Sequence, residues 1–311
     1  MELNIINLFN AMPGACAQGL IWGIMAIGVY ITYKILDLAD LTVDGTMCTG
    51  GAVCVVMILN GFPVWISLLF AFLAGVIAGL VTGLLHTAMG IPAILAGILT
   101  QLGLYSINLR IMGGKANQAL NVDKYDLLVS LRYIKGVPIS QNTILVAAVL
   151  ALLLIGILYW FFGTELGCAI RATGSNSNMS RAQGINTDRM KIFGLMLSNG
   201  IVAFASGLYA QYQGFSEINA GRGAIVIGLA AVIIGEVIFG KISPNFAFKL
   251  LSVVLGAIIY YLVLQVVLWL GLNSNDLKLL SAVVVAVFLA VPYMKGRYFS
   301  KPVKKGGGSH A

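Results

Sequence analysis

Nine long apolar stretches constrain the fold of this chain more than any other feature. A helix that crosses a membrane needs about 17–25 mostly apolar residues. The stretches are continuously apolar, without the alternation that membrane strands show, so we expect helices. They cover residues 13–33, 46–60, 64–86, 93–112, 144–162, 192–209, 224–239, 248–270 and 279–293. The sequence therefore predicts an all-α polytopic membrane protein with nine transmembrane helices, within a range of eight to ten.

Composition excludes a soluble domain. Of the 311 residues, 59% are hydrophobic and only 10% are charged, whereas soluble domains carry about 25% charged residues. The stretches 46–60 and 224–239 are short for a full crossing and are candidates for broken or re-entrant helices. Gly75, Gly79 and Gly83 recur every fourth residue, which permits close helix contact. We favour packing within the bundle over a dimer seam for this glycine stripe.

Lysine and arginine indicate the orientation, because they are enriched on the cytoplasmic side of membrane proteins. Five of them lie between residues 295 and 305, which places the C-terminus and the segment 163–191 in the cytoplasm and the loop 113–141 outside. Nine spans would put the N-terminus outside, and eight or ten would put it inside. We expect one transmembrane domain, 1–298, and a cytoplasmic tail, 299–311, whose last residues 306–311 have the sequence of an appended expression tag.

The segment 163–191, here called the coupling segment, is a polar island between two apolar stretches. Its charged residues are Arg171, Arg181, Arg189 and Lys191 against Glu165 and Asp188. The part 178–184 is compatible with a short helix, and Ser175 and Asn176 precede it as candidate caps. A small structured element between two spans, without a catalytic set, is typical of a docking site for a soluble partner.

Polar residues inside the predicted spans are costly in hydrocarbon and are therefore candidate functional residues. We predict a translocation path from five of them: Gln101, Asn108, Asn199, Gln211 and Tyr212. A second group between the first two spans predicts a gate or a helix break: Asp37, Asp40, Thr42 and Asp44. Interhelical hydrogen bonding is an equal alternative for Gln101, Asn108 and Asn199, and helix capping is slightly favoured for the aspartates.

No enzymatic chemistry is indicated. The sequence shows no catalytic triad, metal-binding motif or cofactor fingerprint, and its four cysteines form no CxxC pair. Residues 235–241 resemble a phosphate-binding loop, but Ile242 stands where that loop needs serine or threonine. The basic residues are scattered and do not form a nucleic-acid-binding stripe. We therefore expect no metal, cofactor or nucleic-acid partner for this chain.

Five segments carry a family resemblance: LDLADLTVDG, GIPAILAGILTQLGLYSINLRIMGG, GTELGCAIRATGSNSNMSRAQGINTDRMKIFGLMLSNG, AQYQGF and GLAAVIIGE. They resemble the permease subunits of bacterial ABC importers, in the branch of the branched-chain amino acid, ribose and simple-sugar permeases. The likeness extends over residues 12–295 and is greatest to permeases paired with tryptophan/tyrosine-type substrate-binding lipoproteins. It implies a fold distantly similar to the cobalamin importer and a homodimer in the bacterial cytoplasmic membrane.

The resemblance also implies partners. Each copy would rest on an ABC ATPase subunit, which binds ATP and magnesium, and an extracellular binding lipoprotein would deliver the solute. The ATPase-coupling residues that carry over are Glu165, Gly167, Arg171, Ala172, Gly174, Asn176, Arg181, Ala182, Gly184, Ile185 and Asn186. We expect the small ones to permit close approach of the ATPase, and the two arginines to supply charged hydrogen bonds.

The implied function is import of a small polar solute, an amino acid with a preference for aromatic ones. A sugar, a nucleoside or a branched-chain amino acid is the alternative cargo within the family. Two other classes remain open from the residues alone. One is an ion-coupled secondary transporter that uses Glu236 or the aspartate cluster, and the other is an assembly scaffold.

Overall fold

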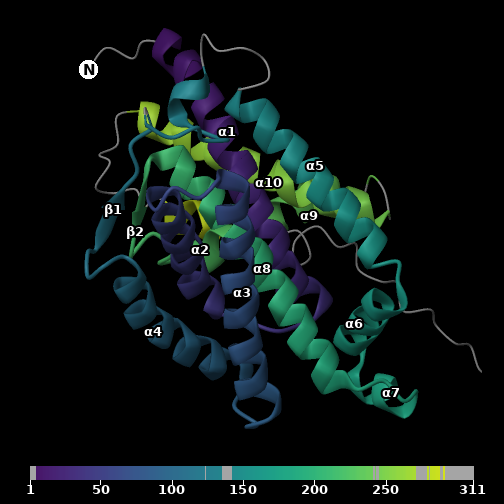
Figure 1. Cartoon of the computed structure of the whole chain (residues 1–311). Helices are drawn as coiled ribbons and strands as arrows, with labels where there is room; N and C mark the ends of the chain where they lie inside the picture. Colours follow the sequence, from purple (N-terminus) through teal and green to yellow (C-terminus); the bar gives the residue numbers. More distant parts are fainter. Residues whose placement is uncertain are drawn as a thin grey trace, which may run out of the picture.

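The computed structural model describes residues 5–122, 124–134, 142–240, 242, 245–270, 279, 281–287 and 290. It is helical almost throughout, as predicted (Figure 1). The long helices are α1 (Ile5–Tyr30), α2 (Thr42–Leu59), α3 (Val64–Thr87), α4 (Ala93–Ile111), α5 (Thr143–Phe161), α8 (Thr187–Gln213), α9 (Ala224–Phe239) and α10 (Phe246–Trp269). The short elements are the π-helix η1 (Ile31–Ile35), the strands β1 (Asn117–Ala119) and β2 (Phe215–Glu217), the 3₁₀ turn η2 (Leu131–Ile134), and the helices α6 (Glu165–Ser175) and α7 (Ser177–Ala182).

Eight of the nine predicted spans correspond to these long helices. Seven helical segments of the described residues are long and apolar enough to cross a membrane, and α9 is a shorter apolar helix. The ninth predicted span, 279–293, lies mostly outside the described residues, although 281–287 are helical. Together they give a multi-pass membrane protein.

The bundle has two distinct ends (Figure 1). One end, the α6 face, carries α6 and α7. The other, the sheet face, carries β1 and β2, which pair antiparallel in the register Asn117↔Glu217. The start of α1 lies at the sheet face, where Gly14 and Tyr212 line one cavity. Its end lies at the α6 face, where Tyr30 and Arg171 line another. The start of α1 and the coupling segment are therefore on opposite sides, as the five spans predicted before the coupling segment require.

Helix α8 lies at the centre of the bundle, and the glycine stripe of α3 packs against it. A Cβ atom added at Gly75 would collide with the carbonyl of Asn199, and one at Gly79 would collide with the carbonyl of Leu195. Only glycine lets the two backbones approach this closely. The stripe serves packing inside the chain, which confirms that interpretation over a dimer seam.

Helices α2 and α9 both begin inside the bundle. After η1 the chain turns at Asp37, whose φ of 54° lies in the left-handed region, and continues without helix until α2 begins at Thr42. The α9 helix begins beside α2, because the Asp44 carboxylate accepts hydrogen bonds from the amides of Gly223 and Ile225, both at 3.0 Å. Only α9 is shorter than a full crossing, because α2 begins four residues earlier than expected and is long enough to span a membrane. That the two helices are broken or re-entrant stays a prediction.

Candidate functional site

Three polar side chains fix the shape of the coupling segment. Thr164 caps α6 by accepting from the Gly167 amide, and Asn176 caps α7 by accepting from the Met179 amide at 3.0 Å. Asn186 caps α8 in the same way. Side-chain oxygens at these positions satisfy amides that have no partner within the helix. The predicted short helix is therefore α7, and Asn176 is its cap, whereas Ser175 closes α6.

Two glycines of the coupling segment make close contacts inside the chain. A Cβ atom at Gly174 would collide with the Ile35 carbonyl, and one at Gly167 would collide with the Phe161 carbonyl. We expected small residues here to admit the ATPase. For Gly174 the structure supplies a different reason for a small residue, because its contact holds α6 against η1 at the end of the first span. The role of these residues toward the ATPase stays a prediction.

The two arginines are also engaged within the chain. Arg181 donates to the Thr187 hydroxyl at 2.7 Å and to the Asp188 carboxylate at 3.1 Å, which ties α7 to the start of α8. The Arg171 guanidinium lies 5.4 Å from the centre of the Phe246 ring on α10, a cation–π distance. Arg181 therefore has structural partners, whereas the exposed Arg171 and Arg189 have no ion pair with a described residue.

The exposed part of the segment is the α7 turn. Met179 is 63% exposed, and Ala182 and Gly184 are exposed as well. Gly184 has a φ of 81°, so the turn itself requires glycine. Sequence reasoning missed Met179, although the signal was present, since it is the one apolar side chain in the run SNSNMSR. An exposed apolar side chain on an otherwise polar turn is suited to a protein contact.

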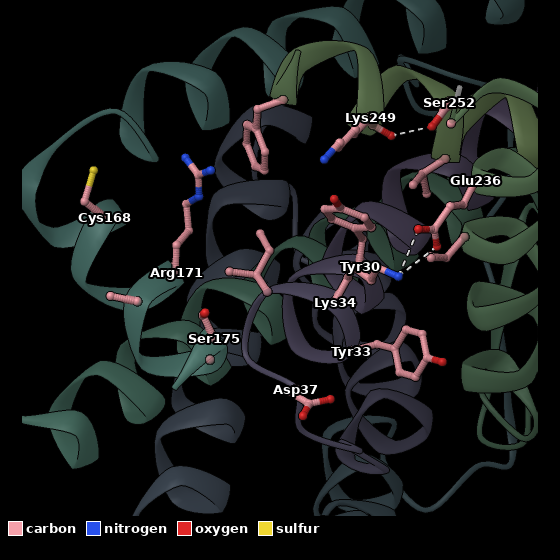
Figure 2. A pocket seen from close by; sticks show the side chains of 17 residues that line it. Tyr30, Tyr33, Lys34, Asp37, Cys168, Arg171, Ser175, Glu236, Lys249 and Ser252 are labelled. Atoms are coloured by element: carbon pink, nitrogen blue, oxygen red, sulfur yellow. Dashed lines mark hydrogen bonds and ion pairs between the residues drawn. The ribbon is translucent and has the colours of Figure 1, made fainter. Parts of the chain in front are cut away.

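A cavity of about 870 Å³ lies behind α6. The end of α1, α6, α9 and α10 line it, and Figure 2 shows Lys34, Arg171 and Lys249 among its side chains. The Lys34 ammonium lies 2.9 Å and 3.0 Å from the two Glu236 oxygens (Figure 2). This ion pair joins η1 to α9 near the α6 face. Glu236 is therefore engaged in a contact between spans, which agrees with a structural role at the interface.

Asp40 and Asn199 form a polar network inside the bundle. Asp40 is only 2% exposed. Its carboxylate accepts from the Thr42 amide at 2.9 Å and from Asn199 Nδ2 at 2.7 Å. Thr46 donates to Asn199 Oδ1 at 2.7 Å. Asp40 thus caps α2, as Asp44 caps α9, and the capping interpretation of these two aspartates is confirmed.

The other predicted gate residues lie apart. The Thr42 hydroxyl is 2.7 Å from that of Thr82, and Thr82 donates to Thr100 at 2.8 Å, so Thr42 links α2 to α3 and α4. Asp37 is exposed and lines the large cavity behind α6. The four residues therefore mark the helix break but do not form one constriction.

The five predicted path residues occupy three separate places. Gln101 and Asn108 line a second cavity, between α2 and α4, while Asn199 is part of the Asp40 network. Gln211 accepts from the Leu128 amide at 3.2 Å, and the Tyr212 hydroxyl donates to the Gly14 carbonyl at 3.1 Å. Gln211 holds the loop that contains Leu128, and Tyr212 holds α1. The structure therefore does not place all five residues along one path.

Comparisons with known proteins agree with this architecture. The family described as "Branched-chain amino acid transport system / permease component" matches residues 12–292. The chain is 41% identical to the tyrosine transport system permease protein of Clostridioides difficile over 273 residues, which is 88% of each protein. It is 35% identical over 189 residues to the autoinducer 2 import system permease protein LsrC of Yersinia pseudotuberculosis, covering 60% of this chain and 51% of LsrC.

A solved structure shares the fold at low sequence identity. PsaBC from Streptococcus pneumoniae, in complex with Fab, aligns with a TM-score of 0.54 and 16% identity, covering 95% of this chain and 99% of that chain. The family match and the arrangement of spans around the coupling segment lead to one conclusion: this chain belongs to the permease family of branched-chain amino acid transport systems and is a transport subunit, not an enzyme.

Proposed function

We propose that the chain is the transmembrane subunit of an ATP-driven ABC importer in the bacterial cytoplasmic membrane. Its cargo is an amino acid, with a preference for aromatic ones. The observation that carries the proposal is the exposed α6–α7 turn in a chain 41% identical to a tyrosine transport permease. The match to LsrC keeps a sugar-like solute as the alternative cargo. On the sheet face, an extracellular binding lipoprotein would deliver the solute.

The ATPase docks on the α7 turn, around Met179 and Ala182. ATP and magnesium bind to that partner and not to this chain. When ATP closes the ATPase dimer, α7 and α6 move together. The contact between Gly174 and Ile35 passes the movement to η1 and to the broken start of α2. Two packed arrangements of these elements would give the inward- and outward-facing states.

The second permease copy faces α4. Three helices, α3, α4 and α5, leave most of their surface uncovered in one copy. The uncovered faces of α3 and α5 are apolar, with residues such as Leu73 and Leu153, as lipid requires. Helix α4 exposes apolar residues as well, such as Leu99, Leu102 and Ile107, but it adds the polar residues Tyr105, Ser106 and Arg110. This mixed face fits a partly polar path between two copies better than contact with lipid alone.

Co-purification with the ATPase encoded beside this gene tests the docking site. Met179→Asp puts a charge on the α7 turn without breaking any contact that ties α7 to α8. We expect the ATPase to purify with the wild type and to be lost with this variant. The matched control is Met89→Asp, because Met89 is 69% exposed in the loop after α3, at the same end of the bundle.

Two results would contradict the proposal. If Met179→Asp retains the ATPase as well as Met89→Asp does, the α7 turn is not the docking site. If the chain alone in liposomes accumulates tyrosine in response to an ion gradient, it is a secondary transporter. In that case Glu236→Gln should abolish the ion coupling.

A further inference from the structure

A second cavity, of about 280 Å³, lies between α2, α4 and the segment that leads into α9. Its polar lining residues are Asp44, Gln101, Tyr105, Asn108 and Arg222. Pockets for small molecules measure about 300–1,000 Å³ and carry a few converging polar groups. This cavity is just below that range, so its size suits one small molecule. Tyr105, which lines it, is an exposed residue of α4.

Asn108 provides an unused acceptor in this cavity. The residue is only 1% exposed. Its Nδ2 donates to the Gly45 carbonyl at 3.4 Å, while its Oδ1 has no hydrogen-bond partner among the described residues. Buried polar atoms are nearly always paired. A buried acceptor that lines a cavity therefore indicates a donor that comes from outside the chain.

Two opposite charges, Asp44 and Arg222, line the same cavity, and neither is in a salt bridge with a described residue. The ion pairs that the described residues form are Lys34–Glu236 and Arg181–Asp188, so neither Asp44 nor Arg222 takes part in one. The start of α9 donates two amides to Asp44, which offsets only part of its charge. The half-buried Asp44 carboxylate is costly inside a bundle unless a cation pairs with it, whereas Arg222 is exposed and can turn toward an anionic group. A ligand that carries both charges would pair each of them.

We propose that this cavity binds the zwitterionic backbone of a free α-amino acid. The α-carboxylate pairs with Arg222, and the α-ammonium donates to Asn108 Oδ1 and to Asp44, which is adjacent to Gly45. The ligand's side chain lies along Tyr105 and Leu102, which also line the cavity. The site rests on the proposed amino-acid cargo and deepens it. A neutral sugar would leave both charges unpaired, so the site favours an amino acid over a sugar.

Equilibrium binding of labelled L-tyrosine to the purified chain in lipid nanodiscs, without ATPase or binding lipoprotein, tests the site. We expect saturable binding. Tyramine, which lacks the carboxylate, and 3-(4-hydroxyphenyl)propionate, which lacks the ammonium, should each compete about 10- to 100-fold more weakly, as expected for loss of a charged hydrogen bond.

Two variants test which residue binds the carboxylate of the ligand and which binds its ammonium group. Arg222→Gln should weaken L-tyrosine binding by a similar factor and leave tyramine binding unchanged. Asn108→Leu should weaken L-tyrosine and tyramine and leave the propionate unchanged. The controls are Arg110→Gln and Ser106→Ala, which change exposed residues of α4 outside the cavity lining. Because Arg222 is exposed, its variant remains informative even if Asn108→Leu does not fold.

The outcomes separate this site from the proposed function. Absence of L-tyrosine binding to the wild type, or unchanged binding to Arg222→Gln, overturns the site. Uptake of tyrosine by cells that contain the complete transporter is measured in parallel. ATP-dependent uptake with no effect of Arg222→Gln leaves the importer standing without the site. Binding in nanodiscs without any ATP-dependent uptake supports the site and contradicts the importer.

Discussion

At the scale of single residues, the buried contact between Asp40 and Asn199 should contribute more to stability than a neutral hydrogen bond does. Asn199→Ala removes a 2.7 Å hydrogen bond to a buried carboxylate and should lower the free energy of unfolding by about 2–3 kcal/mol. The neighbouring Ser198→Ala removes a neutral bond to the Gly28 carbonyl and should cost about 1 kcal/mol. Thermal unfolding of the two purified variants measures the difference, and equal shifts would contradict a charged network.

Residue roles could be predicted only where the partner is close in sequence. Asp40 caps Thr42 two positions later, and a run of aspartates before an apolar stretch already indicates a cap. Asp44 instead caps α9, 179 residues away, which no local pattern reveals. Arg181 has partners only six and seven residues away, but its contacts depend on the turn by which α7 folds back on α8, which the sequence pattern did not predict.

At the scale of elements, the close packing of α3 on α8 depends on the glycines of α3, which have no side chain to keep the two backbones apart. Gly79→Leu would force the α3 backbone away from Leu195, and we expect a loss of at least about 3 kcal/mol or failure to fold. Gly156→Leu on α5 is the control, because a Cβ at Gly156 meets no atom of the described residues within 4 Å. The yield of monodisperse protein and its melting temperature are measured for both variants. If Gly79→Leu is as stable as Gly156→Leu, the packing argument is wrong.

Contact between α6 and η1 is where movement should pass from the ATPase to the spans. Gly174→Val separates the two elements but leaves the α7 turn unchanged. The ATPase should therefore still bind, while ATP-driven tyrosine uptake falls by at least about tenfold. Ser175→Val changes an exposed residue of the same helix and should transport normally. Normal uptake by Gly174→Val would show that this contact does not transmit the movement.

Apolar runs predicted the long helices because the membrane leaves few alternatives. They did not predict η1, since a π-helix differs from an α-helix only in its hydrogen bonds, here Leu36 to Ile31. Nor did they predict β1 and β2. Strands of three residues carry too little alternation to be read from sequence.

At the scale of the whole molecule, the second copy should lie along α4. With Cys16 and Cys168 replaced by serine, the protein keeps only buried Cys48 and Cys54. In this background Ser106→Cys on α4 should form an intermolecular disulfide in native membranes upon oxidation. Leu153→Cys should not, because the apolar face of α5 is in contact with lipid. Non-reducing electrophoresis measures the dimer. Cross-linking through residue 153 but not 106 would place the second copy on α5. The cavity at Asp44 would then no longer face the path between the copies.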